Sequence, residues 1–88
     1  MVLHMSMYED ISVIPLYIGL VRIYDSELDH TWDEQVFVGL SYSKAHSAVC
    51  GSLKSGWPET ASVQGVIRHY QITPNGEVVF LTWEGDVK

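Results

Sequence analysis

The chain has 88 residues, of which 47% are hydrophobic and only 18% charged, and its eleven acidic and five basic side chains give a net charge of −6. This length suits one domain, and the low charge with ordinary apolar content argues against intrinsic disorder. Binding to a phosphate backbone or an anionic membrane needs clustered Lys and Arg. The five basic residues are scattered along the sequence, so we expect no direct contact with nucleic acid or membrane.

We expect residues 1–88 to form a single domain, with residues 1–7 as a flexible or vector-derived N-terminus. Three Met within seven residues and a His4-Met5 pair suggest the latter origin. Cys50 is the only cysteine, which rules out an internal disulfide and favours a reducing cytoplasm. The longest apolar run, residues 11–24, is broken by polar residues, Pro and Gly, and is shorter than the ~20 residues of a membrane span.

Residues 17–24 are rich in β-branched and aromatic side chains, which predicts a first strand. Pro15 lacks an N–H and is therefore expected at the edge of this strand or before it. Residues 25–34 are polar and predict a loop. Residues 35–42 alternate in polarity and predict a second strand, so the two strands form a hairpin with a long acidic tip.

A helix is predicted over residues 43–55, with Ser41 or Ser43 as its N-terminal cap. Gly56 can end it in a left-handed conformation, and Gly51 marks a close backbone approach or an early end. Small side chains form one narrow apolar stripe, so the helix can lie close to a sheet. The stripe consists of Ala45, Ala48, Val49 and Leu53.

A second hairpin is predicted from strands at residues 62–73 and 78–83, with a bulge at Gly65. The Asn75-Gly76 pair between them favours a tight turn, because both residues tolerate positive φ.

The element order ββαββ indicates an α+β fold: one antiparallel sheet of about four strands with one helix on one face. Residues 78–81 are apolar on both faces, and a single helix cannot cover both faces of such a sheet. The second face is expected to meet another chain, a second copy in a homodimer or the N-terminal segment, unless flanking Tyr and Trp fold over it.

The predicted first loop concentrates negative charge, with five carboxylates in ten residues and no Lys or Arg among them. Its spacing imitates the start of an EF-hand calcium loop, but His30 replaces the required Gly and Val36 replaces the terminal Glu. Calcium binding is therefore the least favoured of three interpretations. The other two, weighted equally, are a docking surface for a basic partner and a solvated tip that aids solubility. The carboxylates are Asp25, Glu27, Asp29, Asp33 and Glu34.

Two tryptophans near these elements are candidate contact residues. Trp32 lies within the acidic segment and would anchor a partner, since buried Trp supplies much of the energy of protein interfaces. Trp57 lies next to Pro58 in a predicted loop and is the second candidate. Core packing is the alternative role for Trp57.

His46 and Cys50 are four residues apart on the predicted helix, so their side chains can meet. A thiolate beside an imidazole can act as a nucleophile, but no orienting third group is specified by the sequence. We therefore assign no catalytic residues and keep a small Cys/His enzyme as the third hypothesis. The His residues and Cys50 lack the spacing of a zinc site, and we expect neither a metal nor a cofactor.

A short acidic chain with the helix sequence Ser43-Lys44-Ala45-His46-Ser47-Ala48, followed by the strand Val63-Gln64-Gly65-Val66-Ile67, resembles small phage-encoded inhibitors of bacterial defence, anti-CRISPR proteins among them. The resemblance covers roughly residues 36–70. It implies no shared catalytic residues, a location in the host cytoplasm, and stoichiometric inhibition by occupying a basic surface of the target.

The sequence thus favours a small acidic, non-enzymatic protein-binding module that inhibits or modulates a host protein. Its partner is expected to present a basic surface to the acidic segment and the neighbouring aromatic residues. The alternative is a structural or assembly protein that self-associates through the uncovered sheet face.

Overall fold

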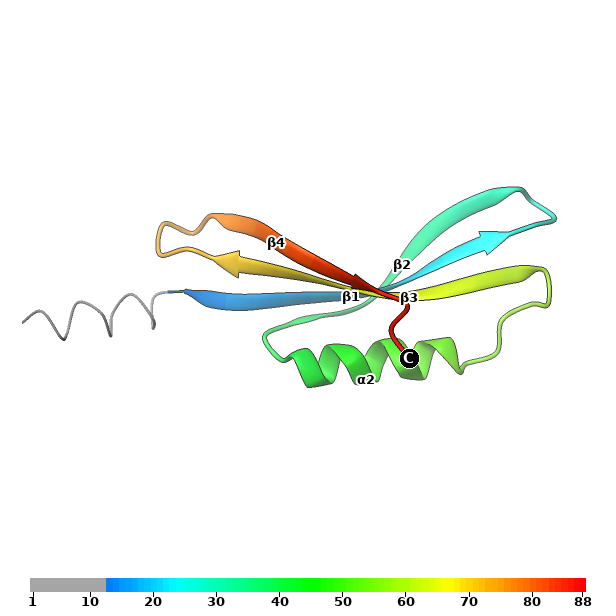
Figure 1. Cartoon of the computed structure of the whole chain (residues 1–88), viewed down its shortest axis with the longest axis horizontal. Helices are drawn as coiled ribbons and strands as arrows, with labels where there is room; N and C mark the ends of the chain where they lie inside the picture. Colours follow the sequence, from blue (N-terminus) through cyan, green and yellow to red (C-terminus); the bar gives the residue numbers. More distant parts are fainter. Residues whose placement is uncertain (1–12) are drawn as a thin grey trace, which may run out of the picture.

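A computed structural model describes residues 13–88, which form four strands and one helix (Figure 1). They follow in the order β1 (Ile14–Asp25), β2 (His30–Gly39), α2 (Tyr42–Leu53), β3 (Ala61–Ile72) and β4 (Val78–Gly85). All neighbouring strands are antiparallel and the sheet order is β2-β1-β3-β4. The predicted α+β fold with ββαββ order is confirmed. The prediction for residues 1–7 lies outside the described residues.

β1 is longer than predicted because it begins at Ile14, and Pro15 lies at its N-terminal end, the first of the two predicted placements. β1 pairs with β3 from Ile14 onward but with β2 only from Tyr17. At Pro15 the strand therefore has a neighbour on one side only, which is where a sheet tolerates a residue without an N–H.

The predicted loop at residues 25–34 was too long, because β2 already begins at His30 and the turn occupies residues 26–29. The polar residues at the start of β2 are aligned with β1, as in the pair Arg22 and Asp33. Polar side chains persist there because β2 is an edge strand and exposed. β2 ends at Gly39, so the predicted strand also ran too far, and Tyr42 begins the helix.

The limits of α2 follow from its caps. The Ser41 hydroxyl accepts a hydrogen bond from the Lys44 backbone N–H at 3.2 Å, which confirms Ser41 as the N-cap. The helix ends at Leu53, slightly earlier than predicted, and Gly56 has the expected positive φ of 88°. The Trp57 indole N–H donates to the carbonyl of Ser52 at 3.0 Å and so satisfies a carbonyl of the last turn.

Two glycines let α2 approach the sheet closely. A Cβ built on Gly19 would lie 2.8 Å from Cγ2 of Val49, and one built on Gly65 would lie 2.6 Å from Cγ1 of the same residue. Ala45 and Val49 are fully buried in this contact, as the narrow stripe of small side chains predicted. The predicted bulge at Gly65 was wrong, because the β1–β3 ladder runs through it without a shift.

The irregularities of the sheet lie elsewhere, at Val36 in β2 and at Leu81 in β4, where one residue is extra on the edge strand. Gly51 also differs from prediction. Nothing lies within 4 Å of a Cβ placed there, so it neither marks a close approach nor ends the helix.

The second hairpin turns at residues 73–77. Gly76 N–H donates to the Thr73 carbonyl at 2.9 Å, and Thr73 N–H donates to the Glu77 carbonyl at 2.9 Å. Only Gly76 of the Asn75-Gly76 pair has positive φ, at 85°. The bonded residues Thr73 and Glu77 therefore enclose a three-residue loop, residues 74–76, that ends in a left-handed glycine. The predicted hairpin is present, but the role expected for Asn75 was wrong.

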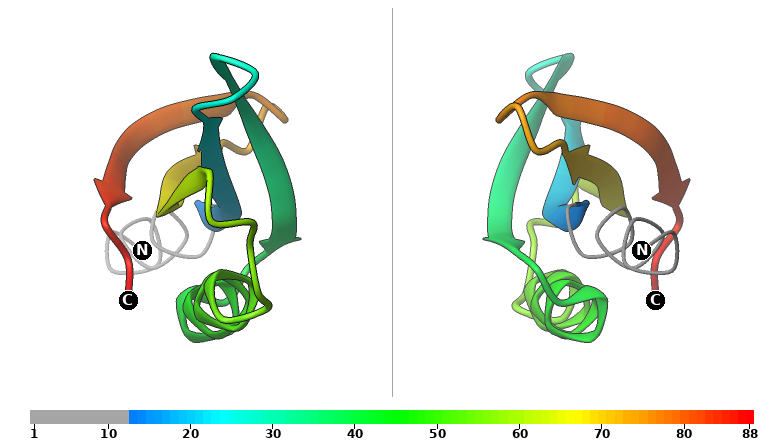
Figure 2. Two further views of the ribbon diagram at one scale, coloured as in Figure 1. Left: turned by 90° about the vertical axis from the view of Figure 1, so that its right-hand side faces the viewer. Right: turned by 90° about the vertical axis from the view of Figure 1, so that its left-hand side faces the viewer.

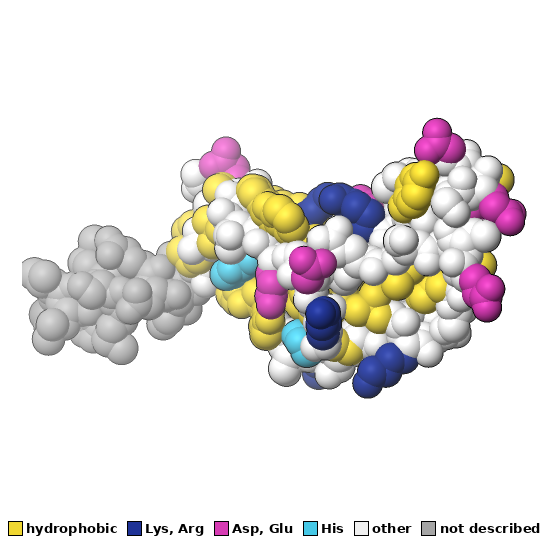
Figure 3. Space-filling model, turned by 45° about the vertical axis from the view of Figure 1, so that its right-hand side comes forward, with side chains coloured by type: hydrophobic (Ala, Val, Ile, Leu, Met, Phe, Trp, Pro, Cys, Tyr) yellow, Lys and Arg dark blue, Asp and Glu magenta, His cyan; other side chains and the backbone are white. Residues whose placement is uncertain are grey.

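The sheet is strongly twisted, and α2 lies against one face of it (Figures 1 and 2). β4 and β2 flank opposite ends of the central β1–β3 pair and rise on the side away from the helix. We call the face opposite α2 the open face. In space-filling form it is hollowed between the two raised ends (Figure 3).

The glycine contact predicts opposite effects for two single substitutions. Gly65→Ala places a methyl group against Val49 and 2.9 Å from the Val87 carbonyl, and we expect it to lower the free energy of unfolding by about 1–3 kcal/mol. Gly51→Ala is the matched control, because its site is open and helical, and should raise stability by about 0.5–1 kcal/mol. Urea unfolding measures both. Equal stability of the two variants would contradict this packing.

Candidate protein-binding surface

The acidic residues predicted as one patch are divided by the hairpin. Asp25 stabilises the turn itself, since its carboxylate accepts hydrogen bonds from the backbone N–H groups of Glu27 at 2.9 Å and Leu28 at 3.3 Å. Asp29 has a positive φ of 49° and accepts a hydrogen bond from the Tyr24 hydroxyl at 3.1 Å. These two carboxylates therefore hold the turn, while Glu27 is an exposed side chain at its tip.

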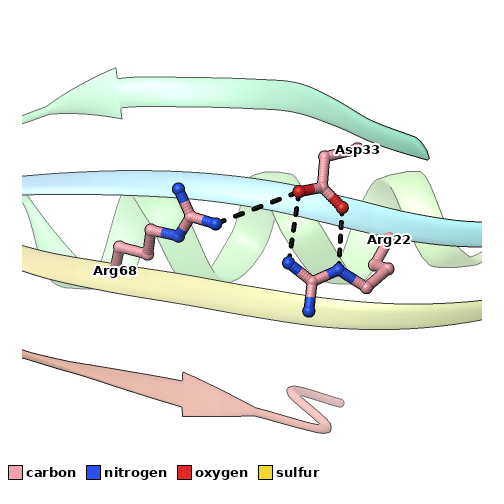
Figure 4. A network of polar contacts seen from close by, with 3 residues as sticks. All are labelled: Arg22, Asp33 and Arg68. Atoms are coloured by element: carbon pink, nitrogen blue, oxygen red, sulfur yellow. Dashed lines mark hydrogen bonds and ion pairs between the residues drawn. The ribbon is translucent and has the colours of Figure 1, made fainter. Parts of the chain in front are cut away.

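Asp33 lies on the open face and pairs with two arginines (Figure 4). The Arg22 guanidinium donates to both carboxylate oxygens, at 2.8 and 3.2 Å, and the Arg68 guanidinium lies 3.9 Å away. The hydrogen bonds from Arg22 lower the pKa of Asp33 below its ordinary value of 3.8, although partial burial opposes this, and the charges of both arginines add to the lowering. Sequence spacing did not reveal this group because its members come from three strands.

Glu34 lies on the opposite face of β2 from Asp33, because side chains alternate along a strand. Its carboxylate accepts a hydrogen bond from the Trp32 indole N–H at 3.3 Å, and that indole stacks on His30 with ring centroids 5.7 Å apart. Trp32 and Glu34 therefore form a small surface with His30 near the hairpin tip. Trp32 is only partly exposed there.

Trp57 lies away from the hairpin tip. It is partly buried and caps the last turn of α2 through Ser52. The structure therefore places the predicted partner-binding residues in three groups: the hairpin tip with Trp32, the open face at Asp33, and the end of α2 at Trp57.

His46 and Cys50 do meet on α2, with the Cys50 sulfur 3.6 Å from Nδ1 of His46. The nearest ring to His46 is that of Tyr42, at 6.0 Å between centroids, and the Tyr42 hydroxyl donates to Glu84 at 2.7 Å. That bond, with burial and the nearby Glu84 charge, raises the pKa of Tyr42. Within residues 13–88 no three His, Cys, Asp or Glu side chains form a group able to hold a metal ion.

A run of exposed apolar side chains lies on β4, which was not predicted as a site from the sequence. Its large apolar side chains are each 42–57% exposed. β4 is an edge strand, and in the part of the chain that the structure describes no strand pairs with its outer side. The sequence signal was present in the run of apolar residues, but nothing in it identified the strand as an edge. These side chains are Val78, Val79, Phe80, Leu81 and Trp83.

No family model, curated protein or solved structure matches this chain. Among the described residues no helix has the length and apolar character needed to span a bilayer.

The ion pair between Arg22 and Asp33 should make a pH-dependent contribution to stability. Because the pKa of Asp33 is lowered by folding, its contribution is complete above the ordinary value of 3.8 and is lost as the pH falls through the lowered value. Asp33→Asn should lower the free energy of unfolding by about 0.5–1 kcal/mol at neutral pH, since the pair is partly exposed but bidentate. Urea titrations at falling pH should show the difference shrink, with Glu27→Gln as the control. A difference that stays constant with pH would contradict the assignment.

Proposed function

We propose that this protein is a non-enzymatic binding module that inhibits or modulates a host protein by stoichiometric association, as anti-CRISPR proteins and similar anti-defence proteins do. The observation that supports this best is the free edge of β4, where apolar side chains are exposed on both faces of the strand. A long apolar edge is a template for pairing with another chain.

Of the two edges of the sheet, β4 is the one suited to pairing. β2 carries Asp33 and Glu34 in its middle, and charges on an edge strand discourage pairing with another strand. Residues 78–83 of β4 contain neither a charge nor a proline. The extra residue at Leu81 is the one local irregularity of its ladder with β3.

The proposed mode of binding is strand addition. A partner segment that extends along β4 satisfies the outward backbone groups by hydrogen bonding and covers the exposed side chains on alternate faces. Each copy of this protein therefore binds one partner segment along β4, which accounts for stoichiometric action without a catalytic step.

Charge favours a partner segment with basic ends over a second copy of the chain. The uncharged segment 78–83 is flanked by Glu77, which precedes β4, and by Glu84, which lies within β4. If two copies of β4 paired antiparallel about their centre, Glu77 of one would lie opposite Glu84 of the other, and like charges directly opposite are destabilising. The net charge of −6 also steers a basic partner towards the protein.

Substitutions on β4 test the binding surface. The double variant Val79→Lys, Leu81→Lys places two charges on the free edge at exposed positions, and we expect it to fold normally. Affinity capture from bacterial lysate, with quantitative mass spectrometry, should show the retained partner reduced by about tenfold or more, as expected when an interface loses its apolar contacts.

The matched control is Val38→Lys, Leu28→Lys, which makes the same exchanges at exposed positions of β2 and the first turn. It should retain the partner. Equal loss in both variants, or no loss in either, would refute the β4 surface. Light scattering should give the monomer mass for the unmodified protein; a dimer abolished by the β4 substitutions would support the alternative of self-association.

The acidic hairpin tip is proposed to contribute electrostatic attraction, through the carboxylates that do not hold the turn. Replacing Glu27 and Glu34 with Gln keeps their size and should weaken capture by about threefold or more at low salt, with a smaller effect at moderate salt because ions screen exposed charges. Glu59→Gln, an exposed acid after Pro58, is the control. If the variant and the control behave alike at both salt concentrations, the tip has no part in binding.

A further inference from the structure

The hollow of the open face contains a groove of about 390 Å³, which includes the open-face side chains Phe80 and Trp83 of β4 in its lining. Basic side chains lie at the bottom of this hollow, between the raised ends of the sheet (Figure 3). Buried Val66 forms part of its lining. The other lining residues are Arg22, Arg68, Tyr70, Phe80 and Trp83.

The charges in the groove do not balance. Two guanidinium groups face one carboxylate, that of Asp33, and Arg22 takes both of its oxygens. Within the described part of the chain, the polar contact of the Arg68 guanidinium is the long ion pair to Asp33 at 3.9 Å. The groove therefore has a net positive charge in a protein of net charge −6, and Arg68 keeps hydrogen-bond donors for another anion.

The wall beside Arg68 is aromatic. Trp83 lies directly across the β3–β4 ladder from Arg68, and Phe80 lies across from Tyr70 with ring centroids 5.4 Å apart. Trp83 and Phe80 are about half exposed, so their ring surfaces are open to a ligand. Flat apolar groups pack well against such rings.

We propose that this groove binds a small organic anion, in which one carboxylate or phosphate group pairs with Arg68 and a flat apolar body packs on Phe80 and Trp83. The volume is that of a small-molecule site, and planar anions suit the fork of an arginine. A nucleic-acid strand is disfavoured, because a polyanion needs a track of basic groups and two arginines with an intervening Asp33 do not supply one. The site does not depend on strand addition at β4.

Titrations of the full chain with small probes, followed by NMR, test the site. Phenylacetate and phenyl phosphate provide the two anionic groups on the same ring, and phenylacetamide is the neutral control. We expect saturable binding of at least one anion in the millimolar range, with the tighter of the two identifying the preferred group, and no saturable binding of the amide.

Arg68→Gln should raise the dissociation constant by about tenfold or more, since a hydrogen bond to a charged group is lost. Phe80→Ala should also weaken binding, whereas Lys44→Gln, which removes an exposed cation on α2, should not. Val79→Lys, whose side chain points to the α2 side of β4, should leave it unchanged and so separates this site from the partner edge. Absence of saturable binding, equal binding of the amide, or full affinity in folded Arg68→Gln would overturn the proposal.

Discussion

The structure depends on a mismatch in length between its helix and its sheet. α2 has 12 residues and is about 18 Å long, whereas β1 and β3 also have 12 residues each and extend about 40 Å. The helix packs tightly where Gly19 and Gly65 let it approach, and Val49 fills that contact completely. It cannot reach the remainder of the sheet. Exposed apolar surface on β4 follows from this geometry, and the open face is exposed because the single helix covers only the opposite face of the sheet (Figure 2).

The same mismatch divides the surface into regions with different chemistry. At one end, the hairpin between β1 and β2 is acidic, and several of its carboxylates are committed to the turn or to arginine. At the other end, residues 78–83 of β4 are uncharged and mostly apolar. Between them, the open face collects the positive charge of Arg22 and Arg68. An acidic body with one apolar edge is suited to protein association, and the proposals above follow from that arrangement.

Local patterns in the sequence predicted the elements well where one signal dominated. The Ser41 cap, the stripe of small side chains and Gly56 defined α2, and the segment around Gly76 defined the second hairpin. Prediction failed for the start of β2, because polar residues are acceptable on an edge strand and residues 30–34 look like a loop in isolation. The start of β1 was also missed, since Pro15 is acceptable where β1 pairs with β3 alone. Gly65 was misread as a bulge because a close helix contact and a bulge both require a missing side chain.

The candidate site was less predictable than the fold. Arg22 and Arg68 are brought together by the β1–β3 pairing, and their sequence spacing gives no sign of it. The apolar run in β4 was visible, but strand order decides whether such a run is buried or free, and no local signal encodes strand order.

The proposed function requires the outer side of β4 to be unpaired and available to a partner. Residue-resolved amide hydrogen exchange on the free protein measures this directly. We expect an alternating pattern along residues 78–83, in which the amides bonded to β3 are protected and those facing outward exchange rapidly. Protection of both sets would refute a free edge, because it would show that the outer side of β4 is already covered in the free protein.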